Sequence, residues 1–254
     1  MRLKKELHQL ASSFNGSASV QIQFTDWSME INPNKKMKSA SLIKLAILLE
    51  GYSLIEQGEL TSGEILPINP EMMTGGAGII SRLSVSRPFS VQDMLTLMIA
   101  VSDNTAANVL IDLLGMDRIN ERCRQIGCVN TQLQRKMMDL SSPHENWISS
   151  RDTVLLMRKI YEHPLHQDMI PVLSGQQFRH KLPALMNPQL FVANKTGELS
   201  GVEHDAAIIM KEGGEPVYAA VLLTDFTDSD EALLLHRKIG KLLSQYMMNN
   251  LSGQ

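Results

Sequence analysis

Strand patterns lie near both ends of this chain of 254 residues, and helical patterns fill the region between them. Residues 19–25 alternate polar and apolar side chains, which is typical of a half-buried strand, and a short second strand is expected around Met29 and Ile31. Further strands are expected at 190–195, 206–210 and 217–224. Strands so far apart in sequence bury their apolar faces together if they join in one sheet. The pattern therefore predicts an α+β fold whose sheet is built from both chain ends.

Helical patterns make up most of the remaining sequence. They are expected at residues 2–14, 41–57, 91–100, 105–114, 116–126, 151–162 and 230–248. The helix that begins at Ser41 is apolar on nearly every side, so it should be buried. We expect a sheet part formed by residues 1–60 and 190–254 and an all-helical part formed by 61–189, with the functional site where the two meet.

Charge and hydropathy exclude two kinds of partner. The net charge is only −3 and the Lys and Arg residues are scattered, so no nucleic-acid partner is expected. The longest apolar runs, 45–49 and 217–223, are too short to cross a bilayer, and the first residues lack the apolar core of a signal peptide. As written, the chain is expected to be a cytoplasmic monomer; it would be extracytoplasmic if a leader had been removed.

The cysteine and histidine pairs do not predict a metal site. Cys123 and Cys128 lie five residues apart with no second pair to complete a zinc site, so we interpret them as packing thiols. His163 and His166 have the spacing of a metal-binding pair, but a proline interrupts them and no third ligand is apparent. We expect a surface loop at this point, and neither a metal nor a cofactor.

Ser41 and Lys44 form the first of three short motifs that suggest chemistry. They lie one helical turn apart, so their side chains share a face. An amine that can lose its proton would activate the serine as a nucleophile, and the helix N-terminus would favour developing negative charge. The structural alternative is a serine cap followed by a lysine that extends to solvent. A lysine is costly in so apolar a helix, which favours the catalytic interpretation.

The second motif, Ser102-Asp103-Asn104, lies between two predicted helices. All three residue types are favoured as helix caps, which is its structural interpretation. In the functional interpretation, Ser102 passes a proton to a leaving nitrogen and Asn104 binds an amide of the substrate.

The third motif, Lys195-Thr196-Gly197, ends an apolar strand. A cation and a hydroxyl at this point would hold a substrate carboxylate, and the glycine would allow a ligand to approach the backbone closely. A strand that simply enters a turn is the structural alternative.

All three motifs occur in this order, and each falls in a suitable context: a helix start, an interhelical loop and a strand end. The probability of such a set by chance is on the order of one in several hundred. The set resembles the signature of class A β-lactamases and penicillin-binding proteins. The similarity extends over nearly the whole chain and includes the segments 75–78, 101–108 and 204–207.

This resemblance implies a β-lactamase-like fold, in which an antiparallel sheet built from both chain ends is flanked by helices and an all-helical region is inserted. It implies that Ser41 attacks a small-molecule β-lactam or a D-Ala-D-Ala-like peptide, with the backbone N–H groups of Ser41 and Glu198 stabilising the oxyanion. Three functions share these acylation residues: a β-lactamase, a D-alanyl-D-alanine peptidase, and a slowly deacylating penicillin-binding or sensing protein.

The residue that would release the acyl group is ambiguous. The family normally has a Glu-x-x-Leu-Asn segment ahead of an Arg-Asp pair; Arg151 and Asp152 are present, but that segment is not. Asp139 has the sequence offset of the family's glutamate, and Glu145 is the alternative. Aspartate is one methylene shorter, and misplacing a base by about 1 Å can cost about a hundredfold in rate. We therefore expect efficient acylation and slow hydrolysis, with Asp139 as the first candidate base.

The family often adds an arginine that grips the substrate carboxylate. In the corresponding region of this chain we find only His204. We interpret His204 as a structural residue rather than a substitute for the arginine.

Overall fold

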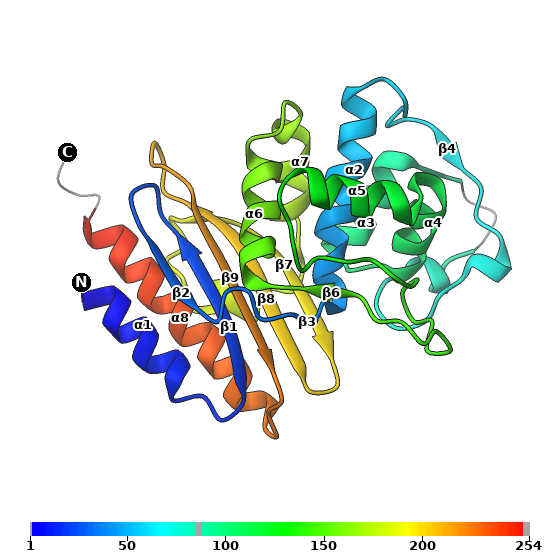
Figure 1. Cartoon of the computed structure of the whole chain (residues 1–254). Helices are drawn as coiled ribbons and strands as arrows, with labels where there is room; N and C mark the ends of the chain where they lie inside the picture. Colours follow the sequence, from blue (N-terminus) through cyan, green and yellow to red (C-terminus); the bar gives the residue numbers. More distant parts are fainter. Residues whose placement is uncertain (1, 85–87, 251–254) are drawn as a thin grey trace.

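The computed structural model describes residues 2–84 and 88–250 (Figure 1). Its centre is a five-stranded antiparallel sheet in the order β2-β1-β9-β8-β7. The strands come from both chain ends: β1 (Ser17–Gln23), β2 (Ser28–Ile31), β7 (Phe191–Leu199), β8 (Val202–Met210) and β9 (Val217–Thr224). The expected α+β fold, with one sheet built from the two ends of the chain, is confirmed.

Helices cover both faces of the sheet (Figure 1). On one face lie α1 (Arg2–Ser12) and α8 (Ser229–Asn250), which pack against each other. On the other face lies α6 (Ser150–Tyr161), which contacts β1, β8 and β9. The apolar contacts of the sheet are therefore divided between two cores, one under α1 and α8 and one shared with the helical part.

The strand expected at 19–25 to be half-buried is buried on both faces. Val20 and Ile22 pack in the same core as Leu7 of α1. On the opposite face, Ser19 is fully buried and donates a hydrogen bond to Ser150 Oγ at 2.8 Å. The expectation was wrong because the polar side of this strand is covered by α6, a helix from a distant part of the sequence.

Most of the remaining elements pack together as a helical part, which includes α2 (Lys44–Glu56), although residues 1–60 were expected to belong to the sheet part. Its other α-helices are α3 (Val91–Ala100), α4 (Asn104–Leu114), α5 (Met116–Gln125) and α7 (His166–Ser174), in addition to α6. Every residue of α2 from Lys44 to Leu54 is buried, as its apolar sequence predicts. Helix α7 was not expected, because Pro171 lies inside it and interrupts the helical pattern. Among the described residues, no helix is both long and apolar enough to cross a membrane.

Short elements join the two parts. The 3₁₀-helices are η1 (Ala40–Ile43), η2 (Pro70–Met72), η3 (Ile80–Arg82) and η4 (Leu182–Leu185), and the short strands are β3 (Met37–Lys38), β4 (Ile65–Leu66), β5 (Phe89–Ser90) and β6 (Trp147–Ile148). β3 pairs with β6, and β4 pairs with β5. The β3–β6 pair matters most for the site, because it places the chain just before Ser41 beside the segment that ends at Asn146.

Candidate active site

Ser41 lies at the junction of the sheet and the helical part. It is the second residue of η1, and α2 begins only at Lys44, so the α-helix does not start at Ser41 as expected. Ala40 has a left-handed backbone (φ 44°), which turns the chain sharply into η1. A Cβ on Gly197 of β7 would lie 3.2 Å from Ser41 N, so only glycine lets the strand pass this close to the serine backbone.

Lys44, the first residue of α2, is completely buried. Its Nζ donates to Ser102 O at 2.6 Å and lies 2.8 Å from Asn104 Oδ1 and 3.1 Å from Ser102 Oγ. Burial, reinforced by the positive charge of Lys195, lowers its pKa well below that of an ordinary lysine, although Asp103 opposes the shift. Burial therefore favours the neutral amine of Lys44 more than water does.

Ser102 connects the two lysines of the motifs. Its Oγ lies 3.1 Å from Lys44 Nζ and 3.1 Å from Lys195 Nζ. Its backbone has a left-handed conformation (φ 55°), an unfavourable state for serine that costs about 1–3 kcal/mol. This turn between α3 and α4 directs the hydroxyl at both amines, so the three groups form a continuous route for a proton.

Asp103 and Asn104 hold the turn in place. Asp103 caps α4 through Ala106 N and also accepts hydrogen bonds from the backbone of Ile79 and Ile80. The Asn104 side chain donates to Gly75 O at 3.0 Å, and its Oδ1 accepts from Lys44. The capping interpretation of the motif therefore holds for Asp103, while Ser102 and Asn104 face the lysine.

Lys195 and Thr196 are both buried in β7. Lys195 Nζ donates to Thr196 O at 2.7 Å as well as to Ser102 Oγ. Burial and the nearby Lys181 lower the pKa of Lys195 to about 7, against the opposing effects of Asp205 and Glu198. The charge of this cation therefore changes within the physiological pH range.

Lys181 is a third buried lysine near the site, and the sequence analysis missed it. It is fully buried, donates to Gly197 O at 3.3 Å and His204 O at 3.1 Å, and forms ion pairs with Glu198 at 2.9 Å and Glu203 at 2.6 Å. It lies outside the expected strands, just before η4, in a stretch with no periodic pattern. No signal in the sequence could have identified it, because its burial depends on β7 and β8.

His204 is a structural residue, as expected. Its Nδ1 accepts from Leu223 N, so its Nε2 bears the proton and donates to Lys38 O at 2.9 Å. Burial lowers its pKa to about 4, although its backbone hydrogen bonds oppose this shift. A neutral imidazole that binds two backbone groups has no hydrogen left for a substrate carboxylate.

A cavity of about 240 Å³ opens beside Ser41. Its lining residues are Ser39, Ala40, Ser41, Gly76, Ala77, Asn104, Arg135, Met137, Met138, Leu140, Glu145, Asn146, Glu198 and Leu199. Larger surface grooves lie between α1 and α8, away from the three motifs. The cavity brings Ser41, Asn104 and Glu198 together with the segment from which a hydrolytic base was expected.

Asp139 is not among the described residues that line this cavity. Its Oδ1 accepts hydrogen bonds from Ser141 Oγ at 2.7 Å and Ser141 N at 3.2 Å. The hydrogen bond from Ser141 lowers the pKa of Asp139, against a small opposing effect of burial. Asp139 has the expected sequence offset from Asp152, but the loop between the two residues does not carry its side chain to the cavity.

Glu145 does line the cavity, where it is paired with Arg135. Arg135 Nη2 and Nε lie 2.7 Å and 3.0 Å from Glu145 Oε1, and Lys38 Nζ lies 3.8 Å from its other oxygen. Asn146 is buried, and its backbone oxygen accepts from Ser39 N at 2.8 Å. These contacts hold the end of the segment, at Asn146, against Ser39, which lies two residues before Ser41.

Comparison with known proteins identifies the family. Residues 2–247 match the model of the Beta-lactamase enzyme family. The chain is 27% identical to "Beta-lactamase regulatory protein BlaB" of Streptomyces cacaoi over 60% of its own length and 49% of that protein. It is 28% identical to a "Beta-lactamase" of Streptomyces fradiae, over 65% of its own length and 58% of that protein. The aligned regions thus span about half the length of these two relatives.

Solved structures show the same fold. The structure of PBP-A superposes with a TM-score of 0.88 and 25% identity, covering 98% of this chain and 96% of that one. A mutant of PBP-A, also at 25% identity and with the same TM-score, is described as an acyl-enzyme complex with penicillin G, with 97% of this chain and 96% of that one covered. This chain therefore belongs to the Beta-lactamase enzyme family, a family of hydrolases.

Proposed function

We propose that this chain is a serine hydrolase that opens β-lactam rings through an acyl-enzyme on Ser41. The observation that supports this most directly is the Ser102 hydroxyl, which lies 3.1 Å from both Lys44 Nζ and Lys195 Nζ. A serine in the short 3₁₀-helix that leads into a buried helix, with a lysine three residues later, is suited to attack an amide carbonyl. Membership of the family and the penicillin complex of a PBP-A mutant support a β-lactam as substrate.

Acylation follows from these positions. Ser41 Oγ attacks the lactam carbonyl carbon, and its proton passes to the neutral amine of Lys44. The C–N bond then breaks, Ser102 Oγ donates a proton to the leaving nitrogen, and Ser102 recovers a proton from Lys44. The backbone N–H groups of Ser41 and Glu198 are assigned to the developing oxyanion. Asn104 lines the same cavity and is assigned to an amide of the substrate.

Release of the acyl group needs a carboxylate that can take a proton from water. We assign this role to Glu145 rather than to Asp139, because Glu145 lines the cavity with Ser41 while Asp139 binds Ser141. The ion pair with Arg135 occupies one oxygen of the Glu145 carboxylate, so Arg135 competes with a water molecule for that group. Deacylation is therefore expected to limit turnover.

A second candidate is a penicillin-binding or sensing protein that stays acylated. It is favoured by one observation: the carboxylate in the cavity is already paired with Arg135. The regulatory protein BlaB and PBP-A among the similar proteins fit this alternative as well. The two candidates differ only in the lifetime of the ester on Ser41.

Intact mass spectrometry over time after mixing with benzylpenicillin tests both candidates. The expected result is a mass increase of one penicillin per chain, which is lost on Ser41→Ala, followed by slow return to the free protein. Return within minutes with continued penicillin consumption supports the β-lactamase. An adduct that persists for hours supports the sensor, and labelling of Ser41→Ala at the wild-type rate would overturn the acylation proposal itself.

A further inference from the structure

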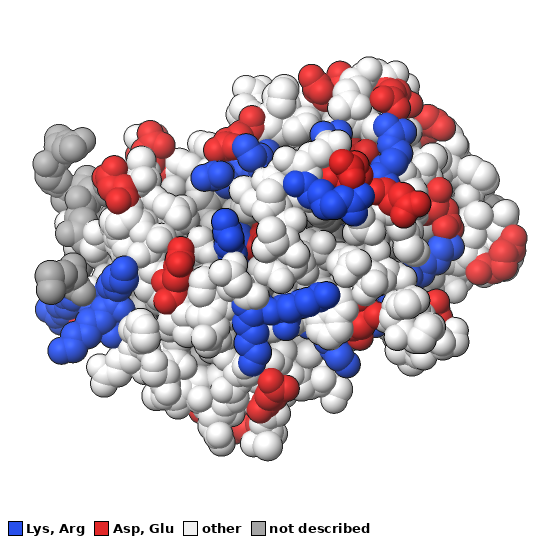
Figure 2. All heavy atoms as spheres, viewed as in Figure 1, with Lys and Arg blue, Asp and Glu red and all other residues white. Residues whose placement is uncertain are grey.

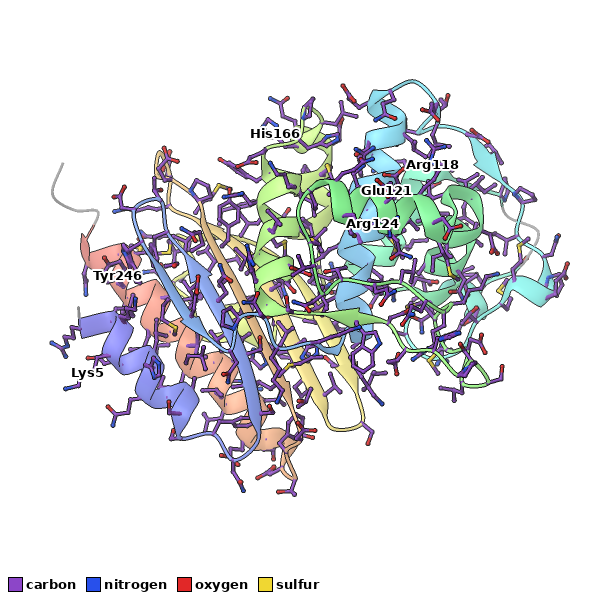
Figure 3. All side chains as sticks on the ribbon, viewed as in Figure 1. Lys5, Arg118, Glu121, Arg124, His166 and Tyr246 are labelled. Atoms are coloured by element: carbon purple, nitrogen blue, oxygen red, sulfur yellow. The ribbon has the colours of Figure 1, made fainter. Side chains whose placement is uncertain are left out.

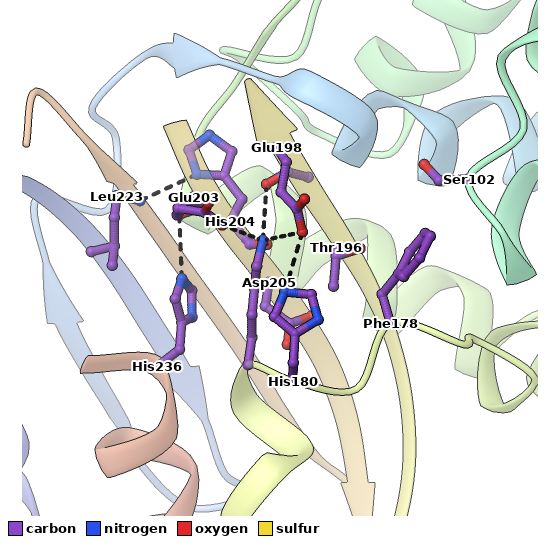
Figure 4. A network of polar contacts seen from close by, with 12 residues as sticks. Ser102, Phe178, His180, Thr196, Glu198, Glu203, His204, Asp205, Leu223 and His236 are labelled. Atoms are coloured by element: carbon purple, nitrogen blue, oxygen red, sulfur yellow. Dashed lines mark hydrogen bonds and ion pairs between the residues drawn. The ribbon is translucent and has the colours of Figure 1, made fainter. Parts of the chain in front are cut away.

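The Glu198 side chain lies on the same face of β7 as Thr196, which was expected to help hold a substrate carboxylate. Thr196 and Glu198 are two residues apart in β7, so both side chains project from the same face of the strand. Glu198 Oε1 lies 2.9 Å from Lys181 Nζ and 3.4 Å from His180 Nε2 (Figure 4). The carboxylate of Glu198 thus pairs with two basic groups, Lys181 and His180, at the end of β7.

The charge of Lys181 is already balanced. Besides Glu198, it pairs with Glu203 at 2.6 Å, and both carboxylates approach the same buried ammonium group. Asp205 adds a third acidic side chain next to the strand; burial raises its pKa to about 6, a shift that Asn194 and Lys181 oppose. Lys181 therefore has no charge left over for an incoming anion, which would have to bind Lys195 and Thr196 beside Glu198.

Glu198 is also held as an anion. Partial burial acts to raise its pKa, but Lys181 together with His180 and Lys195 more than offsets this, and the pKa is lowered overall. Its side chain is 50% exposed, so it faces the solvent from which a substrate enters. A substrate carboxylate that approached Lys195 and Thr196 would meet a like charge held in place by an ion pair.

We propose that Glu198 is a specificity-determining residue that occupies the anion position of the site and selects acyl donors whose leaving side is uncharged over those with a free carboxylate. This inference rests on the proposed acylation of Ser41. It adds a repulsive element to the site, because discrimination between two substrates can come from a penalty on the wrong one as well as from contacts with the right one. Glu198 acts on substrate choice through its side chain, independently of its backbone N–H.

The test compares benzylpenicillin with its methyl ester, which differ only in the carboxylate. Second-order acylation rates are measured for the wild type and for Glu198→Gln, which keeps the size and hydrogen-bonding capacity of the side chain. The variant is expected to gain at least about tenfold with the free acid, since juxtaposed like charges are strongly unfavourable. The ratio of the acid rate to the methyl-ester rate should therefore rise at least about tenfold, because the ester has no charge to repel.

Glu121→Gln is the matched control. Glu121 lies on α5 in the helical part, is 51% exposed and pairs with Arg124 at 2.6 Å, so its substitution makes the same change in charge at a similar ion pair (Figure 3). It should leave the ratio of the two rates unchanged. If Glu198→Gln lowers the melting temperature markedly, Glu198→Ala is measured in its place.

An unchanged ratio of acid to ester in Glu198→Gln and Glu198→Ala would overturn this inference, as would an equal change in Glu121→Gln. Neither result would affect the proposed function, since Ser41 would still be acylated. Absence of any adduct with acid and ester, in wild type and variants alike, would instead refute the proposed function.

Discussion

The two walls of the cavity beside Ser41 are built differently. The inner wall is Asn104, which lines the cavity, together with three residues that lie behind it, Lys44, Ser102 and Lys195; all four are buried and linked by hydrogen bonds of 2.6–3.1 Å. The outer wall is the segment 135–146, in which Leu140 is 82% exposed and no helix or strand is formed. The face of the molecule shown in Figure 2 has basic and acidic side chains intermixed, so the contrast between the walls is one of local packing rather than of overall charge.

This difference separates the two halves of the proposed reaction. The groups assigned to acylation are held by buried helices and a strand, which position side chains more accurately than a loop does. The carboxylate assigned to hydrolysis belongs to the outer wall and is paired with Arg135. A molecule built in this way should form its ester readily and release it slowly.

The largest expected effect comes from the inner wall. Lys44→Met should lower the acylation rate by about 10³-fold, because it removes the group that accepts the serine proton. Methionine fills a similar volume without a buried amine, so the melting temperature should not fall. Labelling with a fluorescent penicillin measures the rate. A reduction of less than tenfold would show that another group activates Ser41.

Loss of Lys195 should have a smaller effect. Lys195→Ala removes a cation that contacts Ser102 Oγ, and acylation by benzylpenicillin should fall by about 10–100-fold, the usual range for a lost charged hydrogen bond. The methyl ester of the same penicillin should be less affected. Equal losses with acid and ester would mean that Lys195 acts only through Ser102.

Two substitutions in the outer wall compare the two candidate bases, Glu145 and Asp139. Glu145→Gln should lengthen the lifetime of the acyl-enzyme at least about tenfold, since it removes the assigned base. Asp139→Asn should leave that lifetime unchanged, because Asp139 is bonded to Ser141 and does not line the cavity. The decay of the adduct is followed by mass spectrometry. The opposite pattern would return the role to Asp139.

The smallest effect is expected from pH. The pKa of Lys195 is lowered to about 7, so its charge is present below that pH and is lost as the pH rises through it. Acylation by the free acid should therefore be about half its low-pH plateau near pH 7, apart from any rising limb due to Lys44. Lys195→Arg should shift this falling limb to higher pH, because arginine stays charged. If the falling limb of the pH profile stays at the same pH in Lys195→Arg, the group that titrates is not Lys195.

The site residues that could be predicted from the sequence are those grouped by short spacings along the chain. Ser41 and Lys44 are one turn apart, and Ser102 and Asn104 share one turn between helices, so their grouping follows from short spacings. Lys195 could be placed from the strand that precedes it. These residues were predictable because each motif is contained within a single element or loop.

The remainder depends on contacts between distant segments. Lys181 is buried only because β7 and β8 pass beside it, and Glu145 lies in the cavity only because β6 pairs with β3. Asp139 was chosen by counting residues back from Asp152, which assumes a loop of the family's shape. The buried polar face of β1 was missed for the same reason, since the helix that covers it is more than 100 residues away.

The segment that forms the outer wall is fastened at both ends. At its start, the backbone N–H groups of Gln134 and Arg135 donate to Asn146 Oδ1, and at its end Asn146 O accepts a hydrogen bond from Ser39 N. Loops tolerate exchange and insertion when their ends stay fixed. Met137 is itself bonded to Asn108 of α4, so residues 139–144 are the part of the segment that can be exchanged without displacing the nucleophile. Under the proposed function, a change of substrate range can then arise in this short stretch while the groups assigned to acylation stay in place.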